Sequence, residues 1–281
     1  MSGESIFKDA EKKLKKWFFV DYDDAMELFE KAATRFKAEK NYIRAGDAFV
    51  RAHDCAVRTK NSPAAARYCA DAVNMYQKTD RTKAATLLDL AVREQIDSNR
   101  LREAGKLEKE YADAIYEDGH GMEAIKHYEK ARRYFDGEDL KSQVKNCDAA
   151  IAKIYGENDE FDKALGLYER LGNSCATGVL RHEAKEFYLR AMLCRLATIR
   201  DDNREVGSAE ATEALNAYMK SDPYLKNTRE AEFLQKVIAA VEDADEEKLE
   251  AAVSLLHELR MLDDWKTHLL LVVKNNMGSI L

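Results

Sequence analysis

The chain has 281 residues, of which 46% are apolar and 35% are charged, and its formal net charge at pH 7 is −7. Two prolines and twelve glycines are few breakers for this length, and no segment shows the bounded alternation of a β-rich fold. The longest apolar runs, such as 269–273, are far too short to span a bilayer, and charges from Lys8 onward interrupt any secretory signal sequence. The composition therefore predicts an all-helical protein without a transmembrane helix.

The first twenty residues form a basic segment that ends in three adjacent aromatic rings. Lysines at positions 8, 12, 13, 15 and 16 precede Trp17, Phe18 and Phe19. Neighbouring positions on a helix point about 100° apart, so the three rings cannot all enter one core stripe. Lysines beside exposed rings suit an anionic membrane surface. The alternative is a capping helix whose rings cover the first helical hairpin.

From residue 25 onward a small residue recurs about every twenty positions. The ladder runs through Ala25, Ala45, Ala65, Ala85, Gly105, Ala124, Val144, Ala164 and Ala184. In several rungs a ring follows four residues later and a small residue seven later, as in Ala184, Tyr188 and Ala191. These positions share one helix face, and turn-forming residues separate the rungs near 40, 61, 80, 99, 119, 137, 159 and 173. Each rung predicts one helix, and two helices make a hairpin.

A period of this kind marks a solenoid, in which each hairpin buries its apolar face against its neighbours. The small-aromatic-small signature is typical of tetratricopeptide repeats, although those repeats run near 34 residues and these hairpins are longer. We predict an all-α, right-handed tetratricopeptide-like solenoid of helical hairpins, a twisted sheet of helices, over residues 1–200. Such arrays usually present a long concave surface that binds other proteins.

Alternate helices of such a stack place residues about forty positions apart on one face. Along that face the sequence puts a cation just after each of four rungs: Arg67, Lys106, Lys145 and Lys185. In an acidic protein this row, the basic stripe, can meet an acidic helical partner and speed the encounter. The alternative is an ordinary solvated face with about one basic residue per turn.

Beyond Arg200 the ladder loosens, and helices are predicted near 204–220, 228–241, 245–260 and 262–277. Residues 201–281 are therefore expected to form a compact C-terminal helical bundle. Acidic residues gather between positions 242 and 250 of this bundle. They either cap helix starts, which favour negative charge, or dock a basic partner.

Nothing in the sequence predicts catalysis, a cofactor or a metal site. It contains no glycine-rich phosphate loop, no HExxH or GxSxG motif, and no Cys/His set with metal spacing. Five cysteines without CxxC spacing are expected to be reduced thiols in the core of a cytosolic protein. The negative net charge and the absence of a basic run interleaved with aromatics argue against nucleic acid as a partner.

Five segments, taken in order, resemble the α-type soluble NSF attachment proteins (SNAPs) over nearly the whole chain. They are 33–48 (ATRFKAEKNYIRAGDA), 124–138 (AIKHYEKARRYFDGE), 161–172 (FDKALGLYERLG), 184–194 (AKEFYLRAMLC) and 262–274 (LDDWKTHLLLVVK). The resemblance implies an adaptor in vesicle-mediated transport that binds the SNARE four-helix complex left after membrane fusion. It also implies that the adaptor recruits a hexameric AAA+ ATPase, N-ethylmaleimide-sensitive factor, for SNARE complex disassembly, and is itself not an enzyme.

The resemblance carries particular residues with it. It implies a SNARE contact at Lys106 and another, on the next-but-one hairpin pair, at Lys185. Where the family has a lysine before the cysteine of an Asn-Lys-Cys sequence, this chain reads Lys145-Asn146-Cys147, so the cation is shifted by one residue. Membrane contact is implied for Trp17, Phe18 and Phe19, in a loop that lacks the family's glycine- and serine-rich insertion.

Contacts to the ATPase are implied at Glu242 and Asp243, whereas a third carboxylate position of the family is Ala239 here. Leu281 takes the place of the near-terminal leucine, although the acidic stretch around it is missing. The resemblance further implies a chain that is monomeric alone, binds in several copies around one SNARE bundle, and is cytoplasmic and peripherally associated with membranes. The alternatives are a γ-type attachment protein and a tetratricopeptide-like cargo or chaperone adaptor that does not act on SNAREs.

Overall fold

The structure is a computed structural model that describes residues 2–15, 20–178, 180–258 and 262–278. In these residues the chain forms α-helices joined by short turns, with two 3₁₀ segments and no strand, so the predicted all-α fold class is confirmed. None of the helices described is both long and apolar enough to cross a membrane. The chain divides into two compact units, Met1–Val144 and Lys145–Leu281. The domain boundary expected at residue 200 stays a prediction.

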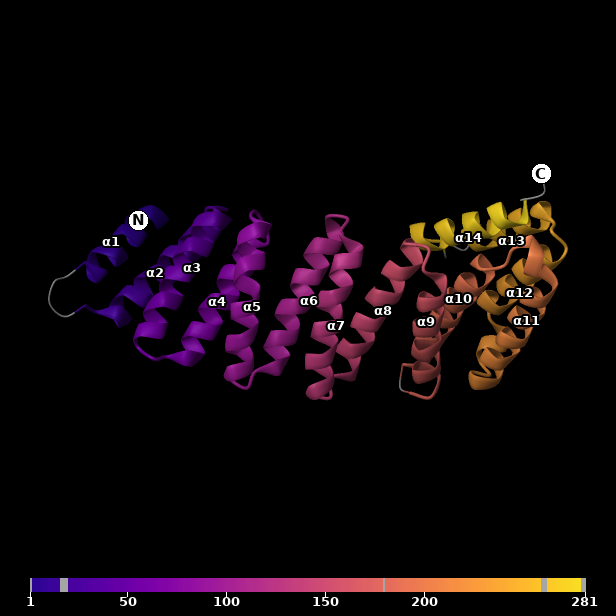
Figure 1. Cartoon of the computed structure of the whole chain (residues 1–281), viewed down its shortest axis with the longest axis horizontal. Helices are drawn as coiled ribbons and strands as arrows, with labels where there is room; N and C mark the ends of the chain where they lie inside the picture. Colours follow the sequence, from indigo (N-terminus) through magenta and orange to yellow (C-terminus); the bar gives the residue numbers. More distant parts are fainter. Residues whose placement is uncertain (1, 16–19, 179, 259–261, 279–281) are drawn as a thin grey trace. The chain divides into compact units, whose positions relative to one another are not determined.

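In unit 1 each helix packs against the next one along the chain (Figure 1). The helices are α1 (Gly3–Leu14), α2 (Tyr22–Ala38), α3 (Tyr42–Arg58), α4 (Ser62–Tyr76), α5 (Arg81–Asp97), α6 (Leu101–Glu117) and α7 (Gly121–Gly137). Helix α8 (Lys141–Glu157) crosses the division between the units. The helices that follow α1 in unit 1 hold 15 to 17 residues, which is the length that the twenty-residue period predicts.

A recurring turn joins successive helices. Lys40, Lys60 and Asn99 each have a positive φ of 55–57°, and the next residue is the N-cap of the following helix. The Asn41 and Asn61 side chains accept hydrogen bonds from backbone N–H groups in the first turn of those helices. These two caps satisfy donors that a helix start leaves unpaired, which explains why the predicted breakers at 40–41 and 61–63 mark real helix boundaries. The predicted breaker at 98–99 also falls at a boundary, although Arg100 makes no side-chain cap.

One predicted breaker was wrong: α9 (Phe161–Ala176) continues through Gly172, Asn173 and Ser174. A β-carbon at Gly172 would lie 2.6 Å from the Tyr188 ring, so this glycine serves a close helix approach.

The small-aromatic-small ladder forms the core where its signature is complete. Ala25, Phe29 and Ala32 are fully buried, and so are the three matching residues of the rung that begins at Ala184. Two rungs are shifted from the expected register. Ala85 is exposed, and its neighbour Ala84 is buried together with Leu88 and Ala91 at the same spacing. Val144 is half-buried, and Cys147, Ile151 and Ile154 carry the buried face of α8.

Gly46 on α3 permits a close approach between helices, and filling this position is expected to destabilise the fold. A β-carbon there would lie 2.5–2.8 Å from three atoms of the buried Tyr76 ring. Overpacking of this kind costs about 1–3 kcal/mol, and alanine recovers up to about 1 kcal/mol of helix propensity. We expect Gly46→Ala to lower the free energy of unfolding in urea by about 1–2 kcal/mol. Gly166→Ala, with nothing within 4 Å of the new carbon, should raise it instead.

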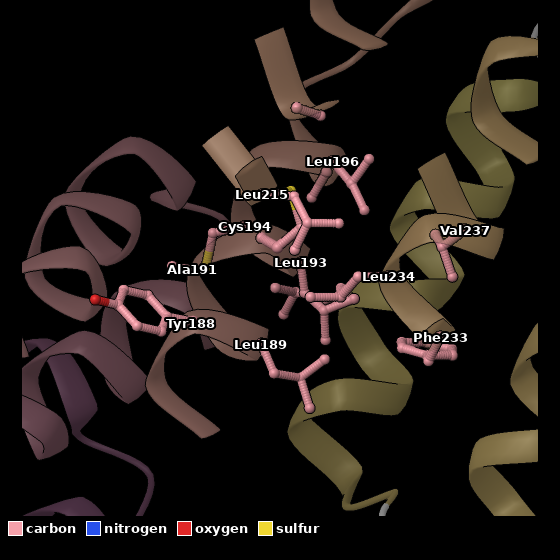
Figure 2. Packing of buried hydrophobic residues seen from close by; sticks show 14 of the residues in the cluster. Tyr188, Leu189, Ala191, Leu193, Cys194, Leu196, Leu215, Phe233, Leu234 and Val237 are labelled. Atoms are coloured by element: carbon pink, nitrogen blue, oxygen red, sulfur yellow. The ribbon is translucent and has the colours of Figure 1, made fainter. Parts of the chain in front are cut away.

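In unit 2 several helices pack around α10. Helix α10 (Arg181–Ala197) packs against α9, α11 (Arg204–Ser221), α12 (Arg229–Glu242) and α14 (Asp264–Met277), and α13 (Glu246–Glu258) packs against α12 and α14. Leu189, Leu193 and Leu196 of α10 point into a core that Leu215, Leu234 and Val237 complete (Figure 2). The four helices predicted after residue 200 are all present, with ends shifted by at most a few residues.

All five cysteines, at positions 55, 69, 147, 175 and 194, are buried free thiols, as the sequence predicted for core cysteines. Burial raises the pKa of the Cys55 thiol to about 11, so this group stays protonated near neutral pH.

Candidate functional site

Within unit 1 the structure brings two members of the basic stripe, Arg67 and Lys106, to the same groove. The groove has a volume of about 230 Å³ and lies between α4 and α6, with Gln95 of α5 and Arg100 at the start of α6 also lining it. The periodicity predicted that positions about forty residues apart share a face, and for these two cations that expectation holds.

Arg67 is held in place by an acid from the helix two before it. Its guanidinium donates to both Glu30 oxygens of α2, over 2.7 and 3.2 Å, and lies 4.3 Å from the centre of the Tyr68 ring. The Tyr68 hydroxyl donates to the same carboxylate over 2.5 Å. The Arg67 hydrogen bond lowers the pKa of Glu30, and burial raises the pKa of Tyr68 to about 12. Arg67 therefore lies on the groove with its charge already paired.

Lys106 is the most exposed member of the basic stripe, with 52% of its side chain accessible. Within the described part of the chain it pairs with Glu103, one turn earlier on the same helix, over 3.0 Å. An exposed pair of this kind contributes little to stability, so the ammonium group is available to a partner.

Acids as well as cations line this groove. Asp71 and Glu110 lie on its wall, and burial raises the pKa of both carboxyls. Gln95 contributes a buried amide oxygen without a hydrogen-bond partner among the described residues. The groove is thus a mixed polar surface with cations at its rim.

In unit 2 the other two members of the basic stripe make interhelical ion pairs. Lys145 of α8 lies 2.5 Å from Glu183 of α10, and Lys185 of α10 lies 2.7 Å from Glu230 of α12. Lys145 is largely buried, and only 5% of the Glu230 side chain is exposed. These pairs connect the helices of the unit, so both lysines have a structural role whatever partner they meet.

Two of the three predicted ATPase contacts lie at the turn between α12 and α13. Glu242 ends α12 and Asp243 follows it, and both are exposed. Asp243 forms a 2.6 Å ion pair with Lys248. Nearby, the Asp245 carboxylate accepts a hydrogen bond from the Lys248 backbone N–H, which lowers the Asp245 pKa and caps α13. Asp245 of the acidic cluster is therefore a helix cap, which is one of the two roles that the sequence suggested for these acids. Glu242 and Asp243 instead face solvent.

The remaining predicted contacts, Trp17, Phe18, Phe19 and Leu281, lie outside the described residues. The helix before the three rings, α1, packs on α2 through Phe7, whose ring centre is 5.1 Å from that of Phe29. Phe7 thus covers part of the first hairpin, and the alternative in which the three rings cover it stays a prediction.

The structure also gathers residues that sequence spacing did not connect. His53, Cys69 and Glu94, from three consecutive helices of unit 1, place their potential metal-ligand atoms within 4.8 Å of one another. Each of the three helices supplies only one member of the group, so no short spacing motif marks the group in the sequence.

Comparison with known proteins places the chain in a family. The family model described as "Soluble NSF attachment protein, SNAP" matches residues 1–278. An alpha-soluble NSF attachment protein of Vitis vinifera is 33% identical over 97% of this chain and 93% of its own length. The human alpha-soluble NSF attachment protein is 27% identical, over 91% of this chain and 84% of its own. A vesicular-fusion protein of Coprinopsis cinerea is 28% identical over 98% and 96%.

Among solved structures, a signal transduction ATPase with a tetratricopeptide repeat sensor from Pyrococcus horikoshii matches with a TM-score of 0.53. The two are 16% identical, and the match covers 97% of this chain and 42% of the other, so the likeness shows the fold alone. It agrees with the predicted tetratricopeptide-like solenoid. With the family match over residues 1–278 and the whole-length relatives, these findings establish that the chain belongs to the soluble NSF attachment protein family.

Proposed function

We propose that this protein is an adaptor that binds the SNARE four-helix complex and recruits the hexameric AAA+ ATPase N-ethylmaleimide-sensitive factor for SNARE disassembly after membrane fusion. The observation that carries the proposal is the family match over residues 1–278, together with relatives named for NSF attachment and vesicular fusion. A solenoid built of helical hairpins suits a partner shaped as a rod, because it offers a surface along many helices.

Lys106 is the residue that we assign most directly to the SNARE contact. Its charge is exposed, it lies on a groove with Arg67 and Arg100, and its neighbour Glu103 restrains it only weakly. Arg67 contributes from the same groove. Lys145 and Lys185 contribute in unit 2, where their ion pairs hold the ammonium groups between helices. Cations at such positions steer an acidic helical bundle toward the adaptor.

Reversing the charge at Lys106 is therefore expected to weaken binding without unfolding the protein. Lys106→Glu should lower the affinity for a purified SNARE complex about tenfold, which corresponds to about 1.4 kcal/mol, and should reduce the salt dependence of binding. Isothermal titration calorimetry at two salt concentrations measures both quantities.

Lys163→Glu is a closely matched control for this variant. Lys163 pairs with Glu160 at the same i,i+3 spacing and the same 3.0 Å distance, and 55% of its side chain is exposed. This change alters net charge equally but lies outside the basic stripe. Equal losses of affinity in the two variants would show that net charge, and not the Lys106 site, governs binding.

At the opposite end of the chain we propose that Glu242 and Asp243 contact the ATPase, because both carboxylates are exposed at one turn. Leu281 is proposed to act with them. We also propose that the protein is monomeric alone, binds in several copies around one SNARE bundle, works in the cytoplasm and has no catalytic activity of its own.

We further propose that Trp17, Phe18 and Phe19 attach the protein peripherally to membranes. Three adjacent rings beside several lysines combine apolar insertion with attraction to anionic lipid. Replacing all three rings with alanine is expected to abolish most cosedimentation with phosphatidylserine-containing liposomes, while solution binding to a soluble SNARE complex stays unchanged. Undiminished cosedimentation would contradict the membrane role.

A tetratricopeptide-like adaptor for an unrelated cargo would have no use for these rings or for the exposed acids at 242 and 243. A γ-type attachment protein would retain the ATPase but bind SNAREs differently. The relatives named above favour neither alternative.

A further inference from the structure

A histidine, a cysteine and a glutamate from three consecutive helices meet inside unit 1. His53 lies on α3, Cys69 on α4 and Glu94 on α5. One ligand atom from each, an imidazole nitrogen, the thiol sulfur and a carboxylate oxygen, lies within 4.8 Å of the other two. In a tetrahedral zinc site with bonds of about 2.0–2.3 Å, neighbouring ligand atoms are about 3.3–3.8 Å apart. Shifts of about 1 Å or less would therefore let the three atoms share one ion.

The group is buried and incompletely satisfied. Only 1% of Cys69 is exposed, and the His53 side chain is largely covered. His53 Nε2 lies 2.8 Å from one Glu94 oxygen, Oε1. The second oxygen, Glu94 Oε2, is buried and has no hydrogen-bond partner among the described residues. A buried carboxylate oxygen without a partner costs free energy, and a bound cation would remove that cost.

The surroundings of His53 fit a metal ligand. Its Nδ1 faces Asp54, with 3.7 Å between Nδ1 and the nearer carboxylate oxygen. A histidine that binds zinc usually donates its other ring N–H to a carboxylate, which orients the imidazole. His53 and Asp54 also line an open depression of about 770 Å³ at the surface of unit 1. The depression reaches the group at His53, whereas Cys69 and Glu94 lie behind it and do not line it.

Other links between alternate helices of this unit use a different chemistry. Arg44 of α3 pairs with Glu4 of α1, and Arg67 of α4 pairs with Glu30 of α2. Helices α3 and α5 share such a pair as well, Asp47 with Lys83, but they also meet at position 53, where the bridging residue is a histidine with a thiol beside it. Structural linkage alone requires a cation and an acid, and it gives no reason for a cysteine sulfur within reach of both.

We propose that His53, Cys69 and Glu94 bind one Zn²⁺ ion that clamps α3, α4 and α5 together, with Asp54 as the residue that positions His53. The mixed N, S and O donor set is one that zinc accepts, and three protein ligands leave the fourth position for water. On binding, the Cys69 S–H bond breaks, the proton leaves to solvent and a Zn–S bond forms.

The test uses the full-length chain, stripped of metal with a chelator and kept reduced. Titration with Zn²⁺ against a chromophoric chelator should show one equivalent bound, and zinc should raise the melting temperature. Co²⁺ used as a spectroscopic probe should give tetrahedral d–d bands and a thiolate charge-transfer band. Absence of the charge-transfer band in the unmutated protein would overturn the site without reference to any variant.

Substitutions then assign the ligands. Cys69→Ser, Glu94→Gln and His53→Gln should each weaken zinc binding by at least about tenfold, and Cys69→Ser should remove the charge-transfer band. Two control substitutions should leave the zinc affinity unchanged. Cys55→Ser removes a different buried thiol, which lies on α3, and His268→Gln removes a histidine that pairs with a carboxylate outside the proposed site. Circular dichroism establishes that each variant is folded. Binding that survives in folded Cys69→Ser and Glu94→Gln variants would contradict the proposal.

Discussion

Replacing Trp265 with alanine is expected to lower the free energy of unfolding of unit 2 by about 3–5 kcal/mol. Trp265 lies in the first turn of α14 and is 4% exposed. Its ring packs against Gly156 of α8, where a β-carbon would be 2.5 Å from the indole, and meets the Tyr168 ring edge-on at 5.5 Å. The indole Nε1–H also donates to the Lys153 carbonyl over 3.0 Å. The variant thus loses apolar burial together with the hydrogen bond from the indole to the Lys153 carbonyl.

Urea unfolding followed by far-ultraviolet circular dichroism measures this loss. Leu271→Ala is the control on the same helix, because Leu271 is exposed and its removal opens no cavity. That variant should change the free energy of unfolding by about 0.5 kcal/mol or less. Similar small effects for both variants would mean that α14 does not rely on Trp265 for its packing.

Lys185→Glu is expected to destabilise unit 2 by about 2–3 kcal/mol. The change sets a second carboxylate against Glu230, which is almost fully buried and lies 2.7 Å from the lysine in the unmutated protein. Breaking a fully buried pair costs about 3–5 kcal/mol, and the value is smaller here because nearly half of the Lys185 side chain is exposed to solvent. Lys185 is also a proposed SNARE contact, so weaker SNARE binding by this variant needs a matching stability measurement.

The swapped double variant Lys185→Glu with Glu230→Lys separates charge pairing from other effects. It should recover most of the lost stability, because the ion pair is restored with reversed polarity. Recovery should be incomplete, since Glu230 lies in the first turn of α12, where a cation is disfavoured by about 0.3–1 kcal/mol. No recovery in the swap would show that the Lys185–Glu230 attraction is not what stabilises this contact.

Helix positions followed from the sequence because one physical rule repeats along it. A small residue, a ring and another small residue at i, i+4 and i+7 share one helix face and can be buried together there. Asparagine caps mark where α3 and α4 begin. The rule failed where packing set the register. Ala84 and Ala85 are both small, and nothing local decides which one enters the core. The sequence pattern predicts a helix break at Gly172, but this glycine lies inside α9, where its missing side chain leaves room for the Tyr188 ring.

Contacts between distant side chains could not be predicted in the same way. The basic stripe was visible as a row of cations, and Arg67 and Lys106 do share a groove. The carboxylate partner of Arg67, Glu30, comes from another helix, and a periodic pattern does not identify it. The same reason hid the zinc ligands: His53 and Glu94 are separated by one hairpin length, with Cys69 on the helix between. That spacing is meaningful only once the solenoid is known.

The measurement that tests the adaptor role most directly is disassembly of a purified SNARE complex by the AAA+ ATPase and ATP, with and without this protein. We expect disassembly to require the unmutated protein, to be impaired by Lys106→Glu and to be retained by Lys163→Glu. Disassembly that proceeds equally well without the protein, or a protein that binds neither the SNARE complex nor the ATPase, would contradict it.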